Sequence, residues 1–241
     1  MRRKISAEIS PVLLNMTQAL NWAAPSAPGL AIAAYVDDDT LRDGDLASCL
    51  SQAEIAKAEA FINLAERRHF IVRRCFQRLF VALVAQWPAS PGVLRMEQKL
   101  DTQPVCLDFP RLHLSFSTSG RSAVAGAREN NDVGIDVERE RVVENVVQLA
   151  RRFFSEKEAD AIAGLPPEEQ SHHFLLHWTA KEAGLKAMGK GIVSGLNSFC
   201  LERKSTDSTY SVIGPPEAPA RWSLRYVDIL PNHIIALIKK E

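Results

Sequence analysis

Residues 133–138 of this chain have the sequence VGIDVE. In it, three β-branched residues alternate with a glycine and two acids, Asp136 and Glu138, and strict alternation predicts a β-strand with one apolar face. On such a strand both carboxylates lie on the same face, about 6.5–7 Å apart along the chain. That spacing allows two side chains to bind one cation, although an acidic pair of this kind is also typical of the solvated face of a hairpin.

A second acidic element follows in the sequence WTAKEAGLKAMGKG, residues 178–191. Its apolar spacing predicts a helix that buries Trp178 and Leu185 and ends at the glycines. Glu182 and Lys186 are four residues apart, so they lie on one stripe of this helix. On an exposed helix such a pair contributes only about 0.2–0.5 kcal/mol, but beside the acidic strand it would suit a metal-bound phosphate.

Together the two stretches resemble the signature of the 4'-phosphopantetheinyl transferase superfamily, in its Sfp-type class with two halves in one monomeric chain. The sequence RFFSEKE, residues 152–158, is similar to a third segment of that family, and the basic pattern from Leu50 to Arg78 is a looser match. The likeness covers most of residues 30–200. It implies an α+β fold in which two α/β halves form a pseudo-twofold pair, each half packing a small antiparallel sheet against helices.

The same resemblance implies a role for each site residue. The Mg²⁺ ligands are then Asp136, Glu138 and Glu182, an all-oxygen set of the kind that Mg²⁺ prefers. Glu182 is the expected acceptor of the proton from an incoming serine, and Lys186 is expected to neutralise charge on the pyrophosphate. The expected contacts to coenzyme A are Lys57, Arg68, His69, Gln103, Ser115 and Lys186. A competing interpretation places the arginine stripe of residues 67–78 on a solvated helix face.

The activity implied by the resemblance is transfer of the 4'-phosphopantetheine arm of coenzyme A to a serine of an acyl or peptidyl carrier protein. The reaction would depend on Mg²⁺ and release 3',5'-ADP. Two departures favour an alternative, a coenzyme A or carrier-protein binding homologue with weak or no catalysis. Phe116 stands where the family has a cofactor-contacting histidine, and Gln103 stands where it has a lysine. Each lost charge-assisted hydrogen bond would weaken binding by about 1.5–3 kcal/mol.

The composition excludes several other classes of protein. At 241 residues, of which 46% are apolar, the chain can bury a large core. Lysine plus arginine and aspartate plus glutamate each number 29, so the net charge of zero provides no general attraction to nucleic acid or membranes. The four cysteines lack a C-x-x-C spacing, and no apolar run is long enough to span a bilayer. With the resemblance, these features predict a cytoplasmic monomer without a nucleic-acid or membrane partner.

Hydrophobic periodicity predicts the order of the elements. Strands are expected at residues 30–36, 112–117, 122–128, 133–138, 197–202, 210–213, 222–228 and 233–238. Helices are expected at residues 51–87, with a break near Asn63, and at 142–163 and 168–188. We place the junction near residue 125: residues 1–125 form an N-terminal half with the coenzyme A phosphate contacts, and residues 126–241 form a C-terminal half with the metal site and the catalytic helix.

Overall fold

The structure is a computed structural model that describes residues 20–22, 30–37, 39–98, 102–189, 195–203, 210–213 and 222–241. The expected helix end at Lys190 and Gly191 lies outside the described residues. Within the described part of the chain, no helix is both long enough and apolar enough to cross a membrane.

The N-terminal half packs a four-stranded antiparallel sheet, in the order β1-β2-β6-β5, against one long helix. Its strands are β1 (Asn21–Trp22), β2 (Leu30–Val36), β5 (Leu112–Ser119) and β6 (Ser122–Glu129). Its helices are α2 (Asp43–Ala47), α3 (Gln52–Glu59), α4 (Leu64–Ala85) and the 3-10 turn η1 (Pro91–Val93), and a small ladder joins β3 (Met96–Glu97) to β4 (Val105–Cys106). The break predicted near Asn63 is confirmed, because its side chain accepts the first free N–H groups of α4.

The C-terminal half packs a five-stranded antiparallel sheet, in the order β7-β11-β10-β9-β8, against a second long helix. Its strands are β7 (Val133–Arg139), β8 (Cys200–Arg203), β9 (Tyr210–Ile213), β10 (Trp222–Tyr226) and β11 (His233–Lys240). Its helices are α5 (Val146–Phe153), α6 (Glu156–Ala163) and α7 (Pro167–Ala187). The strand predicted at residues 133–138 and the helix predicted at 168–188 are therefore both present.

The two halves share one topology. In each, the first long strand pairs with the last strand, which pairs in turn with the one before it, as β2-β6-β5 and as β7-β11-β10. In each, the long helix, α4 or α7, lies between the first strand and this final pair in the sequence. This repetition confirms the predicted α+β class with a pseudo-twofold pair of halves.

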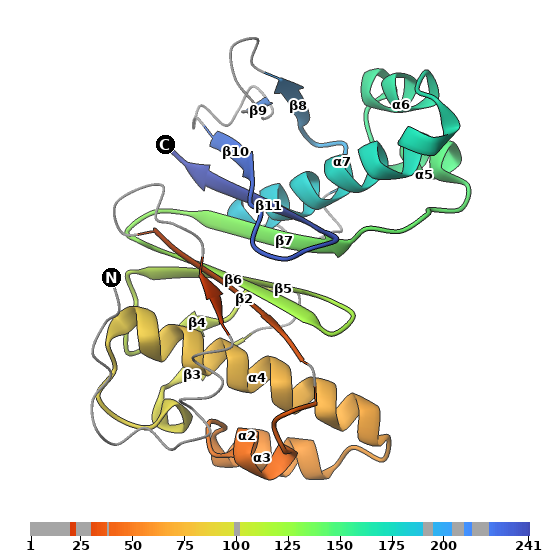
Figure 1. Ribbon diagram of the computed structural model, residues 1–241. Helices are drawn as coiled ribbons and strands as arrows, with labels where there is room; N and C mark the ends of the chain where they lie inside the picture. Colours follow the sequence, from red (N-terminus) through yellow and green to blue (C-terminus); the bar gives the residue numbers. More distant parts are fainter. Residues whose placement is uncertain are drawn as a thin grey trace.

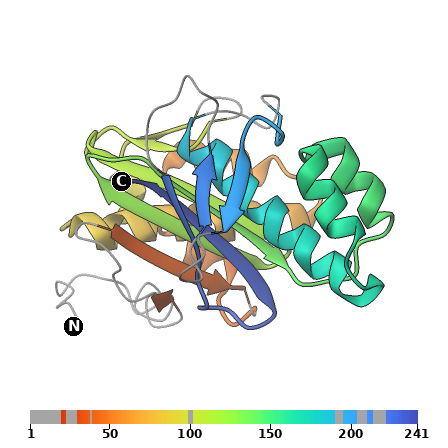
Figure 2. The same cartoon turned by 90° about the horizontal axis from the view of Figure 1, so that it is seen from above.

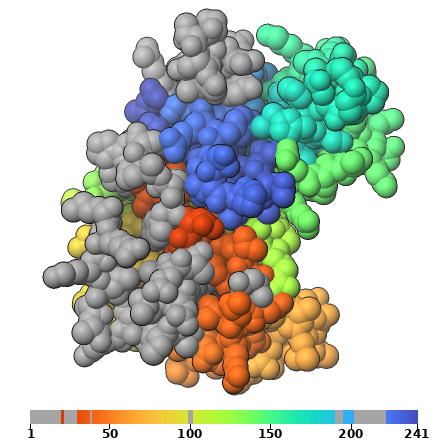
Figure 3. Space-filling view, in the orientation of Figure 1, coloured from red at the N-terminus to blue at the C-terminus, as the bar shows by residue number. Residues whose placement is uncertain are grey.

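The halves stack as four layers: α4, the first sheet, the second sheet and α7 (Figure 1). Seen from above, the two sheets overlap, while α5 and α6 lie to one side (Figure 2). Between the sheets is an apolar core that includes Leu30, Ile32, Val124, Val133, Ile135, Val137, Ile235 and Leu237. The space-filling view shows one face of the molecule, on which the C-terminal strands in blue lie against β2 in red-orange (Figure 3).

The arginine stripe of α4 is buried at Arg74 and Arg78, which corrects the solvated-face interpretation for these two residues. Arg74 and Arg78 are 8% and 2% exposed, and each pairs with Glu54 of α3 at 2.5 Å. Arg78 also donates to the backbone carbonyls of Pro91 and Leu94. These two arginines therefore hold α3 and η1 against α4.

The single helix predicted at residues 142–163 is wrong, because the structure divides it into α5 and α6. The hydroxyl of Ser155 accepts the N–H of Glu158, and the carboxylate of Glu158 accepts the N–H of Ser155. This reciprocal capping box begins α6 and so ends α5 at Phe153.

The junction expected near residue 125 falls inside β6, where Ala125 pairs with both β2 and β5. We therefore propose that the boundary between the halves lies in the turn at residues 130–132, between β6 and β7.

Candidate active site

β7 and α7 approach each other closely at Gly134. A Cβ built on this glycine would lie 1.9 Å from the backbone oxygen of Ala183 and 2.6 Å from the backbone nitrogen of Ala187. Such a gap admits only a residue without a side chain. The contact brings the acidic face of β7 against the stripe of α7 that carries Glu182 and Lys186.

Asp136 of β7 and Lys186 of α7 form the centre of this contact. The Lys186 Nζ atom lies 2.7 Å from Asp136 Oδ1 and 3.3 Å from the backbone oxygen of Ile135. The Ser117 hydroxyl of β5 donates to the same Asp136 Oδ1 at 2.6 Å. Asp136 is 5% exposed, so this carboxylate is held in a largely dry environment.

The two other acids lie beside this pair. Glu182 is 6% exposed and close enough to Asp136 and Glu138 for both charges to act on it. Glu138 lies at the open end of β7, where Arg141 Nη1 binds its Oε2 at 2.7 Å and the Ser119 hydroxyl lies 3.3 Å from the same oxygen. The structure therefore brings all four residues predicted for catalysis and metal binding into one cluster.

Burial and repulsion between like charges favour the neutral, protonated forms of Asp136 and Glu182. Burial raises the pKa of Asp136, against the opposing effects of the Lys186 ammonium and the Ser117 hydroxyl. Burial is also the main reason that the pKa of Glu182 rises to about 7, with repulsion from Asp136 and Glu138 adding to it and Lys186 opposing it. At neutral pH Glu182 is therefore poised between its two protonation states.

We expect Glu182→Gln to change the pH dependence of stability in the absence of divalent cations. The pKa of Glu182 is about 7 in the folded chain and near 4.5 without the fold, so the folded state holds more protons between these values. Its stability must then fall as pH rises through this window. The variant should match the original chain below pH ~4.5 and exceed it by up to about 3 kcal/mol above pH ~7. Urea unfolding across this pH range measures the difference, and a constant difference would contradict the raised pKa.

The donor chemistry of the cluster fits a hard divalent cation. Three carboxylates lie beside the Lys186 ammonium and the Arg141 guanidinium, and repulsion from Asp136 and Glu138 adds to burial in raising the pKa of Glu182. Carboxylate oxygens are the ligands that Mg²⁺ prefers. In the described part of the chain, however, no group of three or more His, Cys, Asp or Glu side chains is arranged closely enough to hold a metal ion. The three ligands predicted from the sequence therefore lie in one cluster, but their side chains are not arranged as a metal site in this structure. Mg²⁺ binding stays a prediction.

Three residues expected to bind coenzyme A lie on the N-terminal helices. Lys57 is exposed on α3, with its Nζ 5.5 Å from the centre of the Phe70 ring, and His69 is exposed on α4. Arg68 binds both oxygens of Asp37 and also contacts Asp43 and the backbone oxygen of Leu41. In the described structure Arg68 thus organises residues 37–43, and none of the three joins the carboxylate cluster.

Gln103 lies beside β5, and Ser115 and Phe116 lie on it. The Gln103 side-chain oxygen accepts the backbone N–H of Phe116 at 2.8 Å. Ser115 is fully buried, and its hydroxyl accepts the backbone N–H of Ile135 at 3.0 Å. Ser115 therefore presents no exposed surface to a ligand in this structure.

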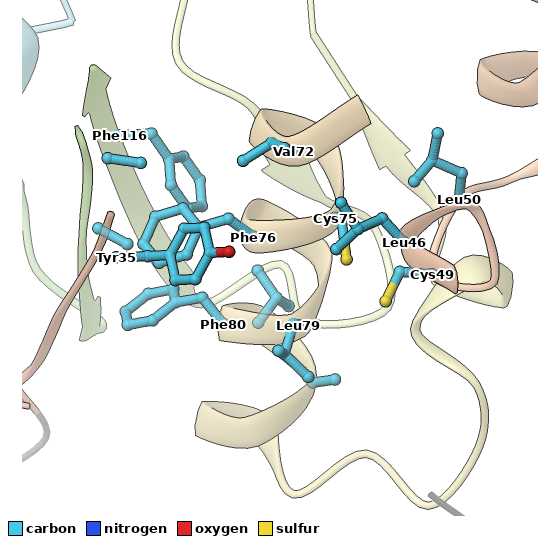
Figure 4. Packing of buried hydrophobic residues seen from close by; sticks show 14 of the residues in the cluster. Tyr35, Leu46, Cys49, Leu50, Val72, Cys75, Phe76, Leu79, Phe80 and Phe116 are labelled. Carbon is cyan, nitrogen blue, oxygen red and sulfur yellow. The ribbon is translucent and has the colours of Figure 1, made fainter. Parts of the chain in front are cut away.

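Phe116, which stands where the family has a cofactor-contacting histidine, is buried in the N-terminal core. Its ring points into the core beneath α4 and meets Phe80 edge-on, with ring centres 6.0 Å apart (Figure 4). Side chains alternate along β5, so the residues that face β7 are the serines on either side of Phe116. The departure at Phe116 therefore concerns packing of the N-terminal core.

Lys181, next to Glu182 in the sequence, points away from the cluster. It is fully buried, and its Nζ lies 3.0 Å from Glu158 Oε2 and donates to the backbone oxygens of Leu196 and Phe199. This pair joins α6, α7 and the segment after α7. Lys181 thus has a structural role, and Lys186 is the lysine that faces the acids.

Comparison with known proteins assigns the chain to a family. Residues 132–238 match the family model described as the 4'-phosphopantetheinyl transferase superfamily. The chain is 33% identical over 165 residues to the 4'-phosphopantetheinyl transferase psf-1 of Bacillus pumilus, covering 68% of both chains. This chain belongs to the 4'-phosphopantetheinyl transferase superfamily. The matched region contains the whole carboxylate cluster of α7 and β7.

Two further superfamily comparisons show how far the likeness extends. The chain is 33% identical over 151 residues to the 4'-phosphopantetheinyl transferase HetI of Nostoc, and this match covers 61% of the chain and 63% of HetI. It thus spans less than two thirds of that relative. Among solved structures, a holo-(acyl-carrier-protein) synthase from Bacillus anthracis in complex with coenzyme A is 19% identical, with a TM-score of 0.40 over 46% of this chain and 95% of the other.

Sequence reasoning missed three residues that contact the superfamily's acidic strand. Ser117 binds Asp136, Ser119 approaches Glu138, and Arg141 binds Glu138. Part of the signal was present, since Ser115 and Ser117 alternate along the strand predicted at residues 112–117 and must share one face. Ser119 lies beyond the predicted end of that strand and continues the alternation in the observed β5. What the sequence did not show is that this face meets β7.

Proposed function

We propose that this chain is a holo-carrier-protein synthase that transfers the 4'-phosphopantetheine arm of coenzyme A to a serine of an acyl or peptidyl carrier protein. The observation that carries the proposal is the contact of Asp136, Glu182 and Lys186 across β7 and α7, within the region that matches the superfamily model. The relatives' printed names state this class of activity for those proteins.

In the proposed reaction the serine hydroxyl oxygen forms a bond to the β-phosphorus of the pyrophosphate, and the bond from that phosphorus to the bridging oxygen breaks. The leaving group is 3',5'-ADP. Glu182 accepts the serine proton as the general base of the reaction. The Lys186 ammonium would neutralise charge on the pyrophosphate as the bond breaks.

Mg²⁺ would be held by Asp136, Glu138 and Glu182 and, when bound, would neutralise and orient the pyrophosphate. Binding would also require these acids to be ionised, and a cation favours that state. Lys186 already pairs with Asp136 at 2.7 Å, which keeps one of the three charges in place before any cation arrives.

The proposed partners are coenzyme A and a carrier protein, with the chain acting as a cytoplasmic monomer. The alternative function is a coenzyme A or carrier-protein binding homologue with weak or no catalysis. Phe116 no longer supports this alternative because its ring lies in the core. Gln103 still does, since a neutral amide stands there.

The direct test is incubation of the chain with coenzyme A, Mg²⁺ and several apo carrier proteins, followed by intact mass measurement. We expect the carrier mass to rise by that of one phosphopantetheine arm, only when Mg²⁺ is present. A carrier whose acceptor serine is changed to alanine should gain nothing. If no carrier gains mass while coenzyme A still binds, the binding homologue is the correct interpretation.

A further inference from the structure

The structure joins the two halves through edge strands that contact each other by side chains. β5 lies at one edge of the first sheet and β7 at one edge of the second. Three alternate serines of β5 face β7, and each makes a contact with it. Unpaired backbone groups at such edges need partners, and the serine hydroxyls supply them here.

The three serines do not have the same partners. Ser115 accepts only the backbone N–H of Ile135 among its described contacts. Ser117 donates to the Asp136 carboxylate at 2.6 Å. Ser119 accepts the backbone N–H of Arg139 at 3.1 Å and lies 3.3 Å from the Glu138 carboxylate. Two of the three serines therefore act on the acidic side chains themselves.

Each acid is thus held from both halves of the molecule. Asp136 Oδ1 receives Ser117 from the N-terminal half and Lys186 from the C-terminal half. In the same way Glu138 Oε2 is contacted by Ser119 and by Arg141. In both carboxylates the described contacts engage one oxygen, so the second oxygen is the one offered to a ligand.

We propose that Ser117 is a positioning residue for the Asp136 carboxylate, and that Ser119 supports Glu138 in the same way. By holding Oδ1, the Ser117 hydroxyl fixes the rotation of the carboxylate and leaves Oδ2 outside the described contacts. The N-terminal half then builds part of the cation site as well as facing the cofactor. The inference rests on the proposed function for its assignment of these acids to a cation.

Binding of Mg²⁺ alone to the full chain tests this proposal without any transfer reaction. Titration calorimetry would compare the original chain with Ser117→Ala, Ser117→Thr and Ser115→Ala. Loss of a partner that orients a metal-binding carboxylate typically weakens metal affinity by about 10–100-fold, so Ser117→Ala should lose about tenfold or more. Ser117→Thr keeps the hydroxyl and should restore most of that loss. Ser115→Ala removes a serine of the same strand and face that contacts only backbone, so its Mg²⁺ affinity should stay unchanged even if its melting temperature falls.

Two outcomes would overturn the proposal: equal Mg²⁺ affinity in Ser117→Ala and Ser115→Ala, or no Mg²⁺ binding by the original chain. These results are separate from the fate of the proposed function. If carrier proteins are modified but Ser117→Ala binds Mg²⁺ normally, the proposed function is supported and the positioning role of Ser117 is contradicted. If no carrier is modified but Ser117→Ala weakens Mg²⁺ binding while Ser115→Ala does not, the positioning role of Ser117 is supported and the proposed function is contradicted.

Discussion

Glu182→Gln is expected to lower phosphopantetheine transfer by about 10²–10⁴-fold, the usual contribution of a general base. The amide has nearly the same shape as the acid but cannot accept the serine proton, and it removes one of the three charges that would hold a cation. Asp136→Asn should have an effect of similar size, because it weakens the contact to Lys186 and leaves that partly buried ammonium without its acid. Initial rates of carrier modification, read by intact mass, measure both losses.

Glu140→Gln is the matched control for these changes. Glu140 follows β7 by one residue and is exposed, and its Oε1 lies 2.6 Å from Nδ1 of His172 in α7, so it has the charge of Glu138 but a partner outside the carboxylate cluster. Its rate should stay within about twofold of the original chain, as for most exposed substitutions. Near-normal transfer by folded Glu182→Gln and Asp136→Asn would mean that the chemistry occurs elsewhere.

Gly134→Ala is expected to reduce both stability and transfer strongly. The added methyl group would meet the Ala183 backbone oxygen at 1.9 Å, and backbone atoms of a helix cannot move aside as a flexible side chain can. α7 must then shift away from β7, and overpacking of this kind costs typically 1–3 kcal/mol and occasionally more. We expect the free energy of unfolding to fall by about 3 kcal/mol, at the upper end of that range. Transfer should fall as well, because Glu182 and Lys186 belong to the displaced helix. Urea unfolding and carrier modification at saturating coenzyme A measure the two effects.

Gly126→Ala provides the matched control. This glycine lies in β6, where a Cβ would meet the Cβ of Ile135 at 3.6 Å, an ordinary contact distance. Alanine should therefore change stability by less than about 1 kcal/mol at this position. Equal behaviour of the two variants would show that close approach at Gly134 is not what brings α7 to the acidic strand.

Several elements could be predicted because their causes are local. The strand at residues 133–138 follows from alternation, and the start of α4 follows from Asn63, whose side chain caps the adjacent turn. The division of α5 from α6 also has a local cause, the capping box of Ser155 and Glu158. The sequence therefore contained the signal that separates these two helices. Short pieces such as α2 and β3 have too few residues for periodicity to reveal them.

The burial of Arg74 and Arg78 could not be predicted from their own helix. An arginine stripe along α4 has the same spacing whether it faces water or another helix, and only Glu54, brought close by the packing of α3, decides the matter. The same holds for Phe116, because alternation places it opposite its neighbouring serines but does not say which face meets the core.

The sequence by itself determined the class of fold, the common face of Asp136 and Glu138, and the shared stripe of Glu182 and Lys186. These follow from the fixed repeats of strand and helix, which depend only on neighbours in the chain. The tertiary structure decided that Lys186 contacts Asp136, and that serines from the other half hold the acids. Such contacts join residues far apart in the chain, so they depend on how sheets and helices pack and not on any local repeat.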